Sequence, residues 1–165
     1  MNGKTVRPGP ADSDFNLTFM EGVTTGGGSG PIGSPNGTSS FTYAWADQPT
    51  AASYQPSSVY QKGEIPVPGC CVDTTSPLVT ATRSSTGVYV VTFPQMPFSN
   101  DPNNAFDKSN VKVSAYGSSG EYCNVGSWTG TSSSASATVR CFDATWRAVD
   151  SRYTVIYSST LYIIG

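Results

Sequence analysis

Two cysteines in the C-terminal half constrain the fold most, because they predict the register of a β-hairpin. If Cys123 lies opposite Cys141 in an antiparallel pair of strands, the same register creates two further cross-strand pairs. Val125 faces Val139 on the side of the sheet that holds the cysteines, and Tyr122 faces Phe142 on the other side. Aliphatic and aromatic cross-strand pairs stabilise sheets. Because one register satisfies all three pairs, the sequence predicts a hairpin closed by a Cys123–Cys141 disulfide, which contributes about 3 kcal/mol through loop closure.

The flanking segments extend this pattern to an all-β chain. Apolar and polar residues alternate, or aromatic and β-branched residues gather, in segments 41–46, 78–83, 88–93, 110–116, 152–157 and 160–164. Short strands separated by turns about every ten residues are typical of a sandwich. We expect an antiparallel β-sandwich, jelly-roll or Ig-like, of about eight or nine strands, with 160–164 as an edge strand and at most one helical turn near 144–148.

The chain divides by composition into an arm and a domain. Residues 1–40 are punctuated by glycine and proline, and within them only 15–20 could pair as a short strand. A segment of this composition behaves as a linker and builds no core of its own. We therefore predict an N-terminal arm over 1–40 that docks to other protein subunits, and a sandwich domain over 41–165.

Charge argues against two classes of partner. Charged residues make up 12% of the chain, the net charge is −2, and Lys and Arg form no cluster, so a nucleic-acid partner is not expected. No apolar run approaches the roughly 18 residues that span a bilayer, so membrane insertion is not expected either. Lys4 and Arg7 are followed by proline and acids rather than by the apolar stretch of a secretory signal. We expect an extracellular location or exposure on a virus particle, reached after loss of a leader or as part of the particle.

Enzymatic chemistry has little support in the sequence. The chain has no His, which excludes Ser-His-Asp and Cys-His sites and the usual zinc sites. Asp101, Asn103 and Asp107 are spaced loosely like calcium ligands, but without the glycine and glutamate of an EF-hand, so we interpret their segment as a solvated loop. Asp150 and Arg152 suggest a turn with a local ion pair or cap. We expect a non-enzymatic protein without a cofactor.

Aromatic side chains are the remaining candidates for binding, because exposed rings stack on sugars. We expect Trp45 and Trp128 to plug the ends of the core. Trp146 lies in a connector rather than on an alternating strand, and so it leads the predicted ligand or partner contacts. The other predicted contacts are Arg147, Tyr54 and Tyr60.

Cys70 and Cys71 are adjacent in a proline-rich loop. With Cys123 and Cys141 paired, they can bond to each other in a tight ring or to another chain. The alternative is two reduced thiols in a cytoplasmic protein.

Several segments resemble a repeat module of secreted bacterial proteins, especially from actinobacteria. They are 43–54 (YAWADQPTAASY), 87–94 (GVYVVTFP), 113–117 (VSAYG), 139–142 (VRCF) and 150–153 (DSRY). The resemblance covers about residues 41–157 in one copy, and the chain departs from the module at Cys70-Cys71 and in the loop over 99–109. Because the module is generally uncharacterised, the resemblance implies a secreted setting and no particular activity.

Together these features predict a structural or adhesion protein on the surface of a virus particle or cell, of the decoration or appendage type and docked through its arm. Glycans and further copies of the chain are the other expected partners. The alternative is a secreted carbohydrate-binding module.

Overall fold

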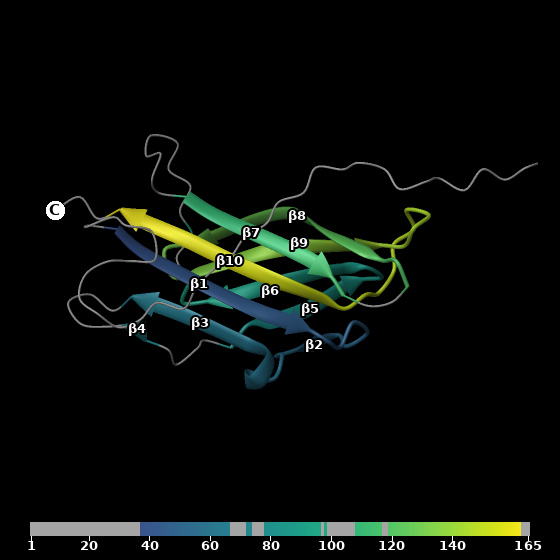
Figure 1. Cartoon of the computed structure of the whole chain (residues 1–165), viewed down its shortest axis with the longest axis horizontal. Helices are drawn as coiled ribbons and strands as arrows, with labels where there is room; N and C mark the ends of the chain where they lie inside the picture. Colours follow the sequence, from purple (N-terminus) through teal and green to yellow (C-terminus); the bar gives the residue numbers. More distant parts are fainter. Residues whose placement is uncertain are drawn as a thin grey trace, which may run out of the picture.

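The computed structural model describes residues 37–66, 72–73, 78–96, 98, 108–116 and 119–162. Within them, two five-stranded antiparallel sheets pack face to face (Figure 1). The first sheet has the order β4 (Val72–Asp73), β3 (Gln61–Pro66), β1 (Gly37–Ala46), β10 (Tyr153–Tyr162), β7 (Lys108–Ala115). The second has the order β2 (Ser53–Tyr54), β5 (Thr80–Ser85), β6 (Val88–Pro94), β9 (Ser134–Phe142), β8 (Tyr122–Thr131). The predicted antiparallel β-sandwich is confirmed.

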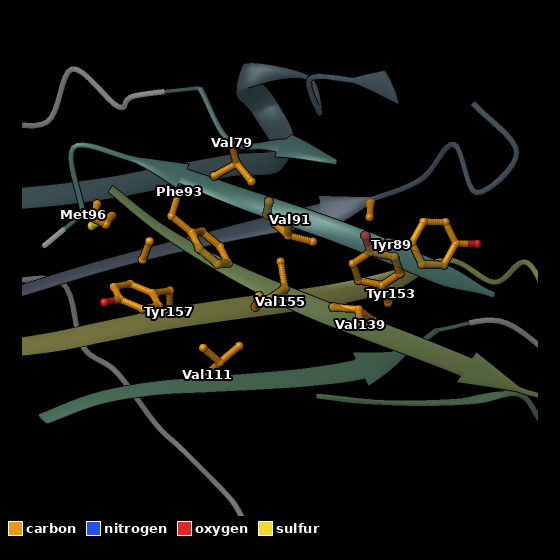
Figure 2. Close-up of a cluster of buried hydrophobic side chains, with 14 of the residues drawn as sticks. Val79, Tyr89, Val91, Phe93, Met96, Val111, Val139, Tyr153, Val155 and Tyr157 are labelled. Atoms are coloured by element: carbon orange, nitrogen blue, oxygen red, sulfur yellow. The ribbon is translucent and has the colours of Figure 1, made fainter. Parts of the chain in front are cut away.

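Large side chains from the central strands fill the space between the sheets (Figure 2). β6 and β9 alternate strictly between buried and partly exposed residues over most of their length, as expected for strands with one face on a core. From β6, the ring of Phe93 stacks on Tyr157 of β10 at 5.1 Å between centroids, and Tyr89 meets Tyr153 at the same distance. Each such ring loses nearly all contact with water, which contributes roughly 2–3 kcal/mol.

β1 turns its large residues outward, contrary to the prediction for Trp45. Thr42, Ala44 and Ala46 are buried, whereas Trp45 is 47% exposed. The reason lies in the neighbouring strand, because β10 places Tyr157, Val155 and Tyr153 beside those three small residues. The bulky side chains of β10 occupy the core, and the aromatic face of β1 is left on the outside.

The predicted register of β8 and β9 is confirmed at one end of the hairpin and changes at the other. Cys123 is bonded to Cys141, and the neighbouring aromatic and valine pairs form as expected. After Val125 a β-bulge shifts the register, so that Trp128 lies opposite the buried Ala137. The prediction that Trp128 belongs to the core is nevertheless wrong: β8 is at the edge of its sheet, and Trp128 is 45% exposed.

The last strand also differs from expectation. β10 is continuous from Tyr153 to Tyr162 and lies between β1 and β7, so the prediction of a separate edge strand is wrong for 160–162, and 163–164 lie outside the described residues. β1 begins at Gly37, inside the predicted arm. The structure describes all of 144–148, and no helical turn forms there; one 3-10 turn, η1 (Ser58–Tyr60), occurs elsewhere. The described residues include no helix that is long and apolar enough to cross a membrane.

Candidate functional site

The connection from β9 to β10 contains a tight turn that displays a tryptophan. Phe142 bridges to Ala148, and within that bridge the Asp143 N–H donates to the Arg147 carbonyl oxygen at 2.9 Å. The Trp146 N–H donates to the Asp143 carbonyl oxygen at 3.0 Å, and Trp146 has a φ of 66°. This arrangement is a three-residue hairpin loop, in which a turn is followed by a residue in the left-handed region.

The side chain of Asp143 holds this turn together. Its Oδ1 atom accepts hydrogen bonds from the backbone N–H and the hydroxyl of Thr145, both at 2.7 Å, and from the Arg147 N–H at 3.1 Å. The hydroxyl bond from Thr145, followed by the two backbone bonds, lowers the pKa of Asp143. The carboxylate is therefore ionised under ordinary conditions and is committed to the turn.

Trp146 occupies a position that such loops usually give to glycine. A side chain with a Cβ atom in the left-handed region costs about 1–3 kcal/mol, and a bulky one is an outlier there. Burial offsets little of this, because Trp146 is 75% exposed. Its one ring contact in the described part of the chain is with Tyr122, edge to face at 5.3 Å. The turn thus presents a large ring to solvent in a strained conformation.

Two aromatic residues of the second sheet lie beneath this ring. Tyr122 stacks on Phe142 at 5.5 Å on the outer face of the sheet, and we call Tyr122, Phe142 and Trp146 together the Trp146 platform. The Tyr122 hydroxyl oxygen is buried and has no hydrogen-bond partner among the described residues. Burial, and secondarily the charge of Asp143, raises the pKa of Tyr122. The platform therefore combines an exposed ring with an unsatisfied polar atom.

Polar side chains adjoin the platform. Arg140 precedes Phe142 by two residues on the outer face of β9 and lies opposite Asn124, and both are exposed. The Arg140 Nε atom lies 3.0 Å from where a Cβ on Gly126 would be, so the arginine stem runs across this glycine, toward the bulge and away from Phe142. Arg147 is exposed at the end of the turn. Neither guanidinium has a hydrogen bond or ion pair to any residue that the structure describes.

The structure separates the predicted contact residues. Arg147 adjoins Trp146, but Tyr54 is on β2, at the opposite edge of the second sheet from β8. Tyr54 packs against the core, and its hydroxyl accepts a hydrogen bond from the Gln48 N–H at 3.1 Å. Burial raises the pKa of Tyr54 to about 12. Tyr60 ends η1, and its side chain lies outside the described part, as do Cys70, Cys71, Asp101, Asn103 and Asp107. The sequence interpretation missed Tyr122 and Phe142 as site residues, although it paired them across the hairpin.

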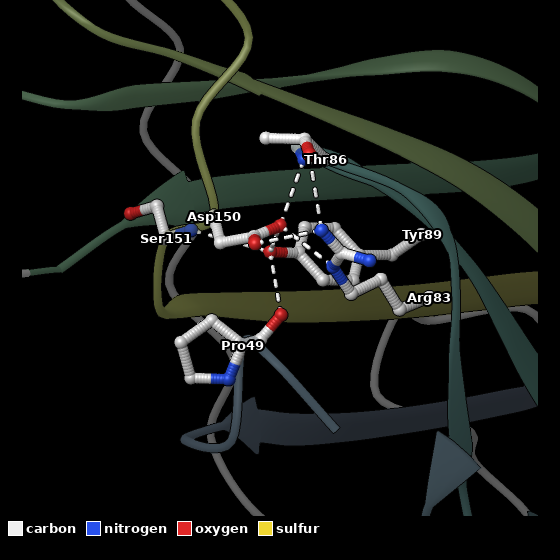
Figure 3. A network of polar contacts seen from close by, with 7 residues as sticks. Pro49, Arg83, Thr86, Tyr89, Asp150 and Ser151 are labelled. Atoms are coloured by element: carbon white, nitrogen blue, oxygen red, sulfur yellow. Dashed lines mark hydrogen bonds and ion pairs between the residues drawn. The ribbon is translucent and has the colours of Figure 1, made fainter. Parts of the chain in front are cut away.

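A second polar cluster surrounds Asp150 (Figure 3). Asp150 pairs with Arg83 at 2.9 Å, so the predicted local pair with Arg152 is wrong. Its Oδ1 atom also accepts hydrogen bonds from the Gly87 N–H at 2.9 Å and from the Tyr89 hydroxyl at 3.2 Å. The side-chain bond from Arg83 is the main cause that lowers the pKa of Asp150. Because these partners occupy its carboxylate, we interpret the cluster as structural.

Tyr89 ties the same cluster to two further segments. Its hydroxyl lies 3.1 Å from the Pro49 carbonyl oxygen and accepts a hydrogen bond from the Ser151 N–H at 3.2 Å. The single phenol proton is shared between Pro49 and Asp150, which fits a residue that fastens loops together. Burial, and then the charge of Asp150, raises the pKa of Tyr89.

Comparisons with protein-family models, curated proteins and solved structures return no match for this chain. The resemblance to the actinobacterial repeat module therefore stays a prediction. In the described ranges, no group of three or more His, Cys, Asp or Glu side chains is placed to hold a metal ion. The Trp146 platform is the arrangement in the described structure that is best suited to contact a ligand or partner.

Proposed function

We propose that this protein is a non-enzymatic adhesion domain, exposed on a virus particle or cell, that contacts its target through the Trp146 platform. One observation carries the proposal. Trp146 is 75% exposed and holds a φ of 66°, so it satisfies neither core packing nor backbone preference. A residue kept in such a conformation points to a role outside folding.

The chemistry of the platform favours binding over catalysis. The carboxylate of the adjoining turn, that of Asp143, accepts three hydrogen bonds within the turn and has a lowered pKa, which suits neither a general acid nor a base near neutral pH. The chain has no His to activate a nucleophile. A flat, exposed ring beside uncommitted hydrogen-bond donors supports recognition by stacking.

A secreted carbohydrate-binding module is the second candidate, and the same platform supports it. An exposed indole stacks on the apolar face of a pyranose ring, while Asn124 and Arg147 offer donors to its hydroxyl groups. The adhesion domain and the carbohydrate-binding module would both bind through the Trp146 platform. They differ in whether the domain is attached to a particle or cell or is secreted.

In the adhesion proposal, the N-terminal arm attaches the domain to other subunits. Because β1 begins at Gly37, the testable arm is 1–36 rather than 1–40. Deleting 1–36 should reduce oligomerisation or particle attachment, measured by light scattering and co-sedimentation, while the melting temperature stays nearly unchanged. A large loss of thermal stability would show instead that the arm belongs to the folded core.

The contact itself is tested with the full chain on a printed panel of neutral, amino and acidic glycans and on intact cells. We expect Trp146→Ala to abolish binding wherever the unaltered protein binds. Trp128→Ala is the matched control, because Trp128 is also partly exposed but lies outside the platform. Equal binding by the Trp146 variant and the unaltered protein would refute the proposed function.

A further inference from the structure

We propose that the outer edge of β8 pairs with the same edge of a second copy of this chain, so that the second sheets of the two copies join across a two-fold axis. β8 lies at one margin of its sheet (Figure 1). A strand in that position presents unpaired backbone N–H and C=O groups, and proteins usually protect it by charge, proline, a bulge or extreme shortness.

Three of the four end strands in the described sheets carry such protection. β2 and β4 have two residues each, and β7 contains Lys108 and Lys112. β8 has ten residues, none of which is charged or a proline. The bulge after Val125 interrupts its first half, but residues 127–131 pair regularly with β9, and four of these five are exposed. The unprotected edge is therefore 127–131.

The backbone groups that point outward along this edge belong to Trp128 and Gly130. The Cys141 N–H donates to the carbonyl oxygen of Gly87, the residue before β6. Because backbone groups alternate in direction along a strand, the even-numbered residues of β9 direct theirs toward β8. The partners of residues 138, 136 and 134 in β8 are Ser127, Thr129 and Thr131. The N–H and C=O groups of the residues between these three consequently point away from the sheet.

An antiparallel pairing centred on Thr129 makes this edge complementary to itself. Thr129 then lies opposite Thr129 of the second copy, and Trp128 lies opposite Gly130 of that copy. The outward N–H and C=O groups of Trp128 meet those of Gly130 in this register, so both such pairs exchange hydrogen bonds. Threonine pairs stabilise antiparallel strands, and no like charges are brought together.

The ring of Trp128 supplies the apolar part of the contact. Trp128 lies opposite the buried Ala137, so its side chain is on the core side of the sheet, yet it is 45% exposed because β8 ends the sheet. In the pairing it would lie beside Gly130 of the second copy, where Phe98 packs from the core side. A contact of this size is weak between free molecules and becomes strong where many copies are held on one particle.

Charge substitution at the two-fold axis tests the pairing in the full chain. Thr129 is exposed, so Thr129→Lys should leave the melting temperature nearly unchanged while it places two like charges opposite each other. Sedimentation equilibrium from micromolar to millimolar concentration should show a dimer of the unaltered chain. The dissociation constant of this dimer should increase at least tenfold in Thr129→Lys and in Thr129→Glu.

An equimolar mixture of Thr129→Lys and Thr129→Glu should restore the dimer, because opposite charges then meet. Ser114→Lys is the control, since it adds the same charge at an exposed position of β7, the end strand of the first sheet, and should leave the dimer unchanged. Trp128→Ala should weaken the dimer through loss of the ring, but it leaves the Trp146 platform of each copy intact.

Amide hydrogen exchange measured by NMR tests the register itself. The N–H groups of Trp128 and Gly130 should exchange quickly in dilute protein and slowly in concentrated protein, because only the dimer covers them. The Thr129 N–H faces β9 and should exchange slowly at both concentrations.

Self-association that is unchanged in Thr129→Lys would overturn the inference and assign the contact to another surface. A chain that stays monomeric at millimolar concentration would overturn it as well. If both charged variants are monomeric and their mixture is too, the edge of β8 receives a different strand, such as one from residues 1–36 of another copy, and the pairing with itself is wrong. None of these results bears on the contact through Trp146, which is measured by binding to glycans and cells.

Discussion

Among the turns of this protein that hold a residue in the left-handed conformation, two fill that position in opposite ways. Gly87, between β5 and β6, has a φ of 68°, and Trp146, after β9, has a φ of 66°. At Gly87 an added Cβ would lie 2.6 Å from the Cys141 carbonyl oxygen and within 2.9 Å of two backbone atoms of Val149. At Trp146 the largest side chain occurs at nearly the same backbone angle and points into solvent.

The difference separates a residue that folding requires from one that neither packing nor backbone conformation requires. Gly87 is enclosed by backbone that cannot move aside, so both its conformation and its packing require glycine. Trp146 is not enclosed by neighbouring atoms, so packing does not require glycine at this position. A glycine there would nevertheless relieve the strain of the left-handed backbone. Each turn has its own aspartate, Asp150 for Gly87 and Asp143 for Trp146, which accepts backbone N–H groups. Substitutions at matching positions of the turns of Gly87 and Trp146 can therefore measure how much each turn contributes to stability.

The largest expected effect is that of Gly87→Ala. Its Cβ would meet three backbone atoms and carry left-handed strain as well, so we expect a loss of about 3 kcal/mol or more in the free energy of unfolding. Chemical denaturation measures this loss. Gly120→Ala is the control, because Gly120 has a φ of 75° but nothing within 4 Å of an added Cβ, so only strain should be felt. Equal losses at the two glycines would show that enclosure contributes nothing.

The next effect is expected at Asp150. Asp150→Ala removes the pair with Arg83 and leaves the Gly87 N–H without its acceptor, so we expect a loss of about 2–3 kcal/mol in the free energy of unfolding. Asp143→Ala should cause a smaller loss, because its turn is exposed on the surface. Urea unfolding of both variants measures the two losses in the free energy of unfolding. A larger loss in Asp143→Ala would show that the turn of Trp146, rather than that of Gly87, is the more important for folding.

Low pH should remove the stabilisation that Asp150 and Asp143 contribute to the folded state. Because folding lowers the pKa of Asp150 and Asp143, their contribution to stability is present above the pKa of an unfolded aspartate, about 3.9, and is lost as pH falls through the folded values. Stability measured from pH 5 to pH 2 should fall less steeply in Asp150→Asn than in the unaltered protein. Equal slopes would show that Asp150 titrates alike in the folded and unfolded chain.

The sequence was informative where several local constraints agreed, and it failed where distant residues decide. The register around Cys123 and Cys141 was predictable because a disulfide and two side-chain pairs specify it together. The outward face of β1 was not, since it depends on the tyrosines of β10, more than a hundred residues away. Nor was the Arg83–Asp150 pair, whose members are 67 residues apart.

The candidate site, too, could be predicted from the sequence only in part. A glycine within a strand often marks a bulge, so Gly126 was an available signal for the register shift that moves Trp128. The exposure of Trp146 followed from its place in a connector. Its left-handed backbone could not be predicted, because the segment Asp143–Arg147 contains none of the glycine or asparagine that usually marks such a position.

A small effect is expected at Tyr122. Its buried hydroxyl has no partner among the described residues, so Tyr122→Phe should leave the melting temperature unchanged or raise it slightly. Differential scanning calorimetry measures this change. A clear decrease would mean that the hydroxyl makes a stabilising hydrogen bond in solution.

The most direct test of the central claim, that Trp146 is kept for contact rather than for folding, is Trp146→Gly measured for both stability and binding. Glycine relieves the left-handed strain while removing the contact with Tyr122, so the melting temperature should stay within a few degrees of the unaltered protein or rise. Binding to the glycans or cells that the unaltered protein recognises should be lost. A marked decrease in melting temperature with binding retained would contradict the account and assign Trp146 to the fold.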